Sequence, residues 1–285
     1  MAINNFRELA NCEIEGRTRS TIWRKSPSQI SAQGTWFDMS MSPGTPPPKY
    51  WFDAPPAVAK TISQSADGGL YHGANVSPYT KYLRKFSISA SASTALPIRA
   101  LICDYLLYYP SLDDSTTDPQ LMDNTVTLPR YTNGEGVQML AISVAARTGG
   151  QQFYVTYTNS DGVSGRVSQT VTQSVQAAIG IIVSSGSVSP NGNPFIGLQD
   201  GDKGVRSIES VTMLGADVGL FALILVKPLA EISIGEILTF SEKDFLLNDN
   251  ALPIIQDNAF LTLLFNTQAS VGATVFFGDM KVIWN

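Results

Sequence analysis

Hydrophobic and polar positions alternate with a period of two over much of this 285-residue chain. Phe153, Val155 and Tyr157 give the clearest example, because a polar or amphipathic residue separates each from the next. Such alternation is typical of a β-strand with one buried face. The residues NSDG at 159–162 tolerate positive φ, and the alternation resumes over 163–172, which predicts a hairpin. The pattern therefore indicates antiparallel β-structure.

A second pattern is an almost unbroken apolar run at 98–108, which predicts a strand buried on both faces. Helical patterns are confined to two short stretches, 6–13 and 242–247. The expected architecture is all-β, an antiparallel β-sandwich or jelly-roll-like body. Further strands are expected at 86–92, 177–184, 207–214, 218–226, 236–240, 259–265 and 273–284.

The strand-rich part of the chain spans residues 81–285, which we interpret as the body. It divides by pattern into two halves, 81–185 and 195–285, separated by a turn-rich stretch. A sub-boundary near 185–195 and an architecture of two stacked β-sandwiches therefore stay open as the alternative.

Residues 1–80 differ from the body, because prolines alternate there with aromatic residues. Proline removes backbone donors, and truly disordered linkers are poor in aromatics. We therefore expect an extended N-terminal arm that lies in a groove of its own body or of a neighbouring subunit. A chain without residues 1–60 is expected to fold but not to assemble. The aromatics predicted to bind a partner are Trp23, Trp36, Tyr50, Trp51 and Phe52.

Charge is sparse and uneven along the chain. Charged residues make up 15% of the sequence and the net charge is −5, whereas an average domain has roughly 25% charged residues. Residues 1–60 hold seven Lys/Arg and five Asp/Glu, so the excess of negative charge lies in the remainder. An acidic body argues against nucleic-acid binding. We also expect no signal peptide and no membrane span, because no long apolar window exists.

The residues for metal or nucleophilic chemistry are few. His72 is the only histidine, and it lies in a Gly-rich loop without a nucleophile motif, so a hydrogen-bonding role is favoured over catalysis. Cys12 and Cys103 are the only cysteines, too few for a zinc or iron site. We therefore predict no catalytic residue, no cofactor and no metal ligand.

Carboxylates gather in three polar segments, 111–119, 198–204 and 241–250, which are interpreted as solvated turns. Asp200-Gly-Asp202 could contribute to a calcium site, but the other ligands of an EF-hand loop are missing. The turn interpretation is therefore preferred for all three segments.

Three stretches carry a resemblance to a known class: KYLRKFSISASASTALPIRALICDYLLYYPSLD, DNTVTLPRYTNGEGVQ and FYVTYTNSDGVSGR. They resemble virion structural proteins of tailed bacteriophages, over roughly residues 35–215. The resemblance implies a non-enzymatic component of the particle, capsid-associated or decoration-like, assembled in the host cytoplasm. We expect its partners to be copies of itself and other virion proteins of the capsid, neck or tail.

Two other function classes stay open from the sequence. One is a tail-tip or fibre module that binds a host glycan through aromatic loops. The other is a carboxylate-based glycanase, for which Asp113 or Asp200 would be the residue to test. Oligomeric state, copy number and the identity of the virion component do not follow from the residues alone.

Overall fold

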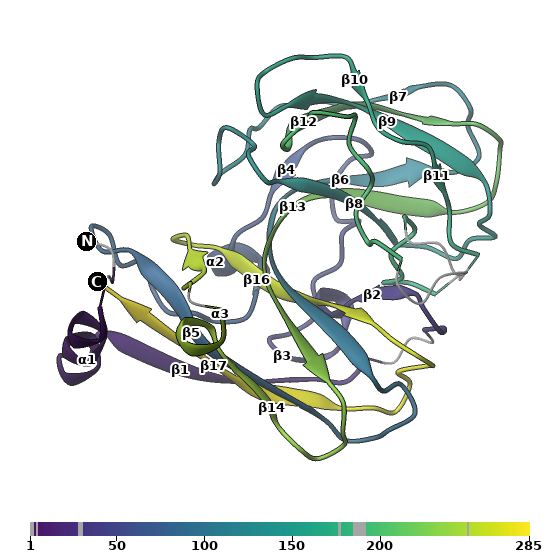
Figure 1. The fold of residues 1–285 in the computed structure, drawn as a ribbon. Helices are drawn as coiled ribbons and strands as arrows, with labels where there is room; N and C mark the ends of the chain where they lie inside the picture. The colour runs from purple at the N-terminus through teal and green to yellow at the C-terminus, as the bar shows by residue number, and fades with distance from the viewer. Residues whose placement is uncertain (1–2, 4, 28–30, 176–177, 185–191, 250) are drawn as a thin grey trace.

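The computed structural model describes residues 3, 5–27, 31–175, 178–184, 192–249 and 251–285. The strands of its described residues pair in antiparallel fashion and form three sheets, which confirms the predicted all-β class. We name the sheets upper, central and lower after their places in Figure 1. The central sheet contributes to both of the interfaces between layers.

The central sheet contains the strands β2 (Trp36–Asp38), β4 (Lys60–Thr61), β6 (Ile98–Asp113), β8 (Gln138–Ser143), β13 (Leu220–Ile234) and β16 (Phe260–Asn266). Their order is β2-β16-β6-β13-β8, with β4 attached to β6. The two long strands, β6 with 16 residues and β13 with 15, pair along their whole length. Three register shifts interrupt that pairing. Such bulges bend a strand pair and increase its twist.

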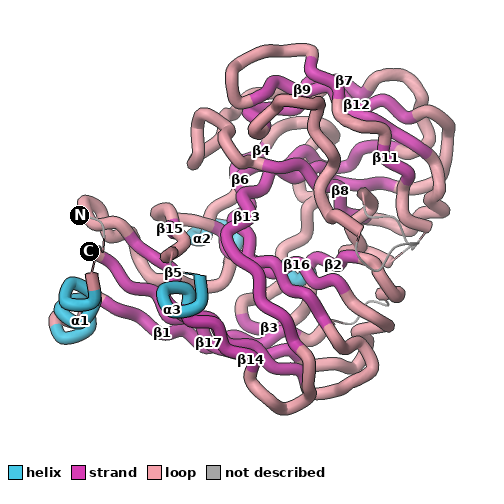
Figure 2. The backbone as a smooth tube through the Cα atoms, viewed as in Figure 1, coloured by secondary structure: helices cyan, strands magenta, loops and turns pink. Residues whose placement is uncertain are grey.

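Residues 180–183 join the two edges of the central sheet. Ile182 donates its backbone N–H to the carbonyl of Trp36 on β2 at 2.9 Å, and Val183 donates to Ala141 on β8 at 2.7 Å. The sheet thereby closes on itself, as the ring of strands in Figures 1 and 2 shows. Closure protects both edge strands from pairing with another chain.

Side chains alternate between the inside and the outside of this closed sheet. On β8, Leu140 and Ile142 belong to the interior core, whereas Met139 and Ala141 face the upper sheet. The central strands are therefore buried on both faces, as the apolar run at 98–108 predicted. The largest side chains of the interior core are Trp36, Trp51, Tyr105, Tyr108 and Phe260.

The upper sheet contains β7 (Gln120–Leu121), β9 (Gln152–Asn159), β10 (Arg166–Val167), β11 (Val171–Thr172) and β12 (Val205–Met213). Its order is β10-β9-β12-β7, with β11 also paired to β9. The hairpin expected after residue 152 is confirmed: β9 alternates buried and partly exposed residues and turns back into β10. Phe153, Val155 and Tyr157 pack against the outside of the central sheet.

The lower sheet contains β1 (Thr18–Lys25), β3 (Gly44–Thr45), β5 (Lys81–Ala90), β14 (Ser241–Asp244), β15 (Ile254–Ile255) and β17 (Phe276–Trp284). Its order is β14-β5-β17-β1-β3, with β15 paired to β5. A second apolar core joins it to β6, β13 and β16 of the central sheet. The strand expected at 236–240 is wrong: Ile237 makes an isolated bridge to Ala90 of β5, and the strand that pairs with β5 begins at Ser241.

Helices occupy the margins of the sheets. The expected helix at 6–13 is present as α1 (Phe6–Ile14), which begins after Asn5, whose side chain accepts from the N–H of Glu8 at 3.0 Å. Two shorter helices, α2 (Gln64–Asp67) and α3 (Phe245–Asp249), and one 3₁₀ turn, η1 (Met39–Met41), complete the described elements.

The fold is thus two stacked β-sandwiches that share their central layer, but they do not correspond to successive halves of the chain. The long strands β6 and β13 each contribute residues to both sandwich cores. On β6, for example, Ile102 faces the lower sheet and Leu106 the upper one. Residues 185–191 of the proposed sub-boundary at 185–195 lie outside the described residues. Strand pairing therefore mixes the predicted halves 81–185 and 195–285.

Residues 1–80 are built into the sheets rather than set apart as an arm. Strand β1 lies between β17 and β3, β2 pairs with β16, and β4 pairs with β6. From the proline-rich stretch between β3 and β4, the side chain of Trp51 enters the interior core of this chain, whereas most of the residues beside it are exposed or half-buried. The strand pairing shows no division at residue 80.

Candidate functional site

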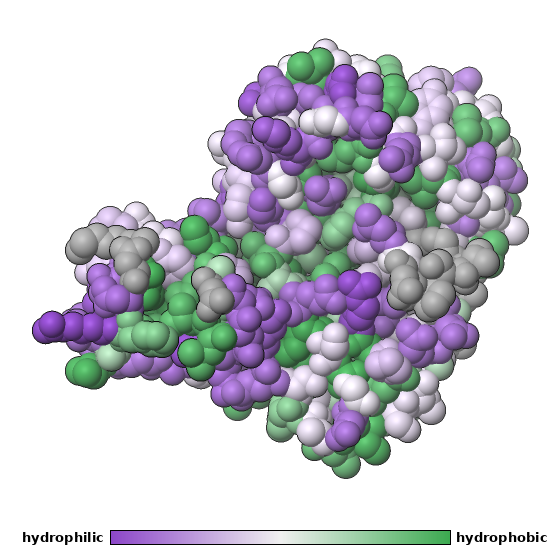
Figure 3. All heavy atoms as spheres, viewed as in Figure 1, coloured by the Kyte–Doolittle hydropathy of each residue, from purple (hydrophilic) through white to green (hydrophobic). Residues whose placement is uncertain are grey.

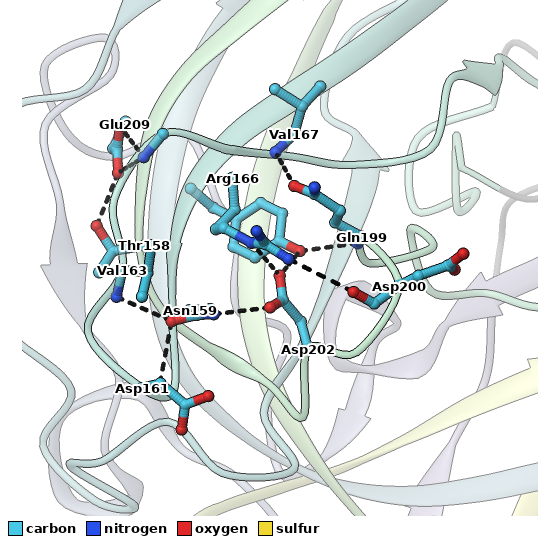
Figure 4. Close-up of polar contacts among 12 residues, drawn as sticks. Thr158, Asn159, Asp161, Val163, Arg166, Val167, Gln199, Asp200, Asp202 and Glu209 are labelled. Atoms are coloured by element: carbon cyan, nitrogen blue, oxygen red, sulfur yellow. Dashed lines mark hydrogen bonds and ion pairs between the residues drawn. The ribbon is translucent and has the colours of Figure 1, made fainter.

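The polar cluster that the sequence emphasised lies at one end of the upper sheet. The turn after β9, residues 159–165, meets the loop 198–204 that leads into β12 (Figure 4). Both segments are polar and Gly-rich, so they form turns between strands of one sheet. We call this the turn cluster.

The turn itself is held by one asparagine side chain. The Oδ1 of Asn159 accepts hydrogen bonds from the backbone N–H of Asp161 at 3.0 Å and of Val163 at 2.9 Å. Gly162 and Gly165 have φ values of 81° and 70°, a region that favours glycine. The residue types of NSDGVSG thus determine the shape of the turn.

Asp202 is the centre of the turn cluster (Figure 4). Its carboxylate accepts from the hydroxyl of Tyr157 at 2.5 Å, the Nδ2 of Asn159 at 2.7 Å and the Nε of Arg166 at 3.0 Å. Burial raises the pKa of Asp202, but the hydrogen bonds, first that of Arg166, outweigh it and hold the pKa below its usual range. Burial and the bond to Asp202 raise the pKa of Tyr157 to about 12.

Glu209 on β12 holds the other side of the same turn. Its carboxylate accepts from the hydroxyl of Thr158 at 2.7 Å and from the N–H of Gly165 at 3.0 Å. Gln199 accepts the N–H of Val167 at 3.2 Å. The carboxylates of Asp202 and Glu209 are therefore engaged with donors of the same cluster, and they stiffen a displayed loop.

A calcium site at Asp200 and Asp202 does not match this geometry. The Asp202 carboxylate already accepts three hydrogen bonds, one of them from the cationic Arg166, which would repel a metal ion. The carboxylate of Asp200 is exposed on the loop, and only its backbone carbonyl meets Arg166, at 3.4 Å. Within the described ranges no group of three or more His, Cys, Asp or Glu residues could hold a metal.

The five aromatics predicted to bind a partner fall into two groups. Trp23, Trp36 and Trp51 are at most 2% exposed and fill this chain's own cores, so they present no ring to a partner. Tyr50 and Phe52 are 41% and 46% exposed, and their rings lie 5.5 Å apart. Of the five residues, Tyr50 and Phe52 are therefore the two for which partner binding stays a prediction.

Two buried ion pairs were missed by the sequence reasoning. Asp114, placed by its sequence in a solvated turn, is fully buried: it accepts from Gln173 at 2.8 Å and pairs with Arg147 at 3.1 Å. Asp104 is equally buried and pairs with Arg130. No local signal could have found either pair, since each partner is distant along the chain.

His72 takes the hydrogen-bonding role that the sequence favoured, although it is fully buried. Asp113, the carboxylate named for the glycanase alternative, accepts from the N–H of Ser115 at 2.8 Å in a turn. Neither residue lies in the turn cluster.

Comparisons with known proteins show no family for this chain. No family model and no curated protein matches the sequence. Among solved structures, that of the Gx strain of infectious bursal disease virus shares 10% identity, covers 94% of this chain and 80% of its own, and has a TM-score of 0.19. The VP2 subviral particle of the same virus gives 11% identity, 94% and 81% coverage, and a TM-score of 0.18. TM-scores this low do not establish a common fold.

The described residues contain no helix long and apolar enough to cross a membrane.

Proposed function

We propose that this chain is a non-enzymatic structural protein of a virus particle, a head-associated subunit that assembles as a symmetric oligomer. The observation that carries the non-enzymatic part of the proposal is the turn cluster of Figure 4, where the acids hold loops in place. Asp202 and Glu209, the engaged carboxylates, are bound to donors of the same cluster, so the site displays a rigid surface and offers no poised acid or base.

The assignment to a virion rests on the sequence resemblance to structural proteins of tailed bacteriophages. Composition supports it, because a surface poor in charge suits a protein that meets other subunits. The closed central sheet adds to the support, since a rigid body with protected edge strands suits repeated assembly. Capsid decoration or cement is the role we favour within this class.

The exposed pair Tyr50 and Phe52 is the surface that we propose for contact with a neighbouring subunit. The two rings lie side by side at 5.5 Å and are about half exposed. Aromatic side chains are enriched at the centres of protein interfaces. The neighbouring Lys49 bridges Asp53 and Asp67, which anchors this segment to α2.

Analysis of purified virus particles tests the proposal directly. We expect quantitative mass spectrometry to find the chain in them, and a particle reconstruction to show many copies on the head. A single ring would instead indicate a neck or tail component, and a tail-tip position with glycan binding would favour the fibre module. Absence from purified particles would refute a virion role.

The aromatic pair is tested by the double substitution Tyr50→Ala/Phe52→Ala. We expect it to leave the unfolding transition within about 1 kcal/mol of wild type, because both residues are exposed, and to lower particle occupancy at least tenfold. Leu121→Ala is the matched control, since Leu121 is 76% exposed on the upper sheet. Equal occupancy of the two variants would rule out this pair as the contact.

A further inference from the structure

The segment between α2 and β5, residues 69–80, is fastened to the body by a small number of contacts. Leu70 donates its N–H to the carbonyl of Leu261 at 2.8 Å, and Val76 donates to the carboxylate of Asp257 at 3.0 Å. We call this segment the latch loop. At its other end Thr80 exchanges backbone hydrogen bonds with Asn285 at 3.0 Å and 3.1 Å. Between these two ends, the buried side chain of His72 holds the loop to the body.

His72 joins the loop to two other elements. Its Nε2 lies 2.9 Å from the carbonyl of Ala259, and its Nδ1 lies 2.9 Å from the Nζ of Lys81, the first residue of β5. A carbonyl only accepts, so Nε2 carries the proton and Nδ1 is the acceptor for the lysine ammonium. Lys81 also donates to the carbonyl of Ala74 at 2.8 Å. The arrangement therefore requires a neutral imidazole.

A second proton on the imidazole cannot be accommodated in this geometry. It would place an N–H of the cationic ring against the ammonium of Lys81, with both side chains at most 1% exposed. Both the repulsion and the lost acceptor would weaken the contact between His72 and Lys81, which helps to hold the loop.

The other charged groups near His72 and Lys81 do not offset the free-energy cost of protonating the imidazole. Arg130 adds a second cation that opposes protonation of His72, whereas the hydrogen bond to the Ala259 carbonyl and the charge of Asp257 favour it without outweighing burial and Lys81. Arg19 of β1 is a further cation near Lys81, and its guanidinium carbon lies 4.4 Å from the centroid of the Tyr71 ring. Burial first, and then Lys81, lower the pKa of His72 to about 4; burial lowers the pKa of Lys81 to about 8.

We propose that the His72–Lys81 contact is an acid-sensitive latch: protonation of His72 releases residues 69–80 while the three sheets stay folded. The inference is independent of the proposed virion role. Release separates Tyr71 from Arg19 of β1.

The sign and the size of the effect follow from proton linkage. The folded pKa of His72, about 4, lies below its ordinary value of 6.5, so the open loop binds protons more tightly than the closed one. Acidification therefore favours opening over the window between these two values. From pH 7 to pH 4 the equilibrium constant for opening should rise roughly a hundredfold.

Hydrogen exchange of the full chain tests the latch. We expect amides of residues 69–80 to lose protection roughly a hundredfold between pH 7 and pH 4, after correction for intrinsic exchange, whereas amides of β6 and β9 keep theirs. His72→Gln retains one donor and one acceptor but cannot be protonated, and its loop should stay protected at pH 4. Unchanged loop protection in the wild type, or equal loss in His72→Gln, would overturn the proposal.

If His72→Gln does not fold, His72→Asn and the wild-type profile decide the matter. The loop must open at a higher pH than the strands do. Simultaneous loss of protection in the loop and in the strands would mean that the whole molecule unfolds in acid, which contradicts a local latch.

Discussion

The substitution Arg130→Met tests how the two sandwich cores are joined. Asp104 lies on β6 between Ile102, which faces the lower sheet, and Leu106, which faces the upper one. Arg130 donates its Nε and Nη2 to the two carboxylate oxygens of Asp104, at 2.9 Å and 2.8 Å. The side chains of Arg130 and Asp104 are 6% and 0% exposed. This ion pair therefore marks the place where the shared strand passes from one core to the other.

The expected loss is large because the pair is buried. Methionine retains the apolar stem of the arginine but leaves the carboxylate of Asp104 without a counter-ion, which costs about 3–5 kcal/mol. The Nη2 of Arg130 also donates to the carbonyls of Ile62 at 3.1 Å and Tyr105 at 2.9 Å. These acceptors lose their donor as well. We expect the free energy of unfolding at pH 7 to fall by about 4 kcal/mol.

The loss should depend on pH in a defined direction. Burial raises the pKa of Asp104 from 3.8 to about 6 even though Arg130 opposes it. Because the folded pKa lies above the unfolded one, stability from this group is present at low pH and is lost as the pH rises through 6. Removing Arg130 raises the pKa of Asp104 further, so the carboxyl stays protonated more readily. The variant should lose less stability at pH 5 than at pH 7.

Urea unfolding followed by far-ultraviolet circular dichroism at both pH values measures the effect. The double variant Asp104→Asn/Arg130→Met should recover most of the stability, because the unpaired charge is gone. Arg166→Met is the matched control: its partner Asp202 lies in the turn cluster, the Arg166 side chain is 25% exposed, and the loss should be much smaller than that of Arg130→Met. A loss below about 1 kcal/mol for Arg130→Met at pH 7, or an equal loss at pH 5, would refute the reasoning.

Two further predictions concern the turn cluster and the N-terminal residues. Asp202→Asn should lower the unfolding free energy by about 1–2 kcal/mol. In calorimetry, millimolar calcium should leave the melting temperature of both wild type and variant unchanged. A rise in melting temperature with calcium would restore the hypothesis of a calcium site. A chain without residues 1–60, expected from the sequence alone to fold, should instead fail to fold, because Trp23, Trp36 and Trp51 each contribute about 3–5 kcal/mol by burial. A cooperative melting transition of the truncated chain would contradict this.

The local features of the fold were predictable from the sequence. The alternation in β9 and the NSDG turn depend on neighbouring residues, and the unbroken apolar run of β6 follows from burial on two faces. Such patterns report how much of a strand is buried. They do not report which other segment buries it: the pattern predicted a strand at 177–184 but not that residues 180–183 close the central sheet.

The candidate site was predicted in part, for the same reason. The Asx-type turn at Asn159 could be recognised from its residues, and so could its structural role. Buried polar residues were not recognised: Asp114 carries a turn-like sequence, and its partner Arg147 lies in another loop. Only the three-dimensional pairing distinguishes a solvated aspartate from a buried one.

The aromatic residues of the first 80 positions show what such a pattern leaves undecided. Trp51 packs against Tyr105, Tyr108 and Phe260, with ring centroids 5.3–5.7 Å apart, so a ring from the proline-rich stretch completes the interior of the central sheet. A proline-stiffened segment rich in aromatics would have looked the same if those rings had been buried in a neighbouring subunit. Because β6 and β13 belong to both sandwiches and this segment fills the space between their strands, the layers should fold as one unit. An assembly contact must then use the residues left over on the surface, among them the exposed aromatic pair Tyr50 and Phe52, which flank Trp51 in that segment.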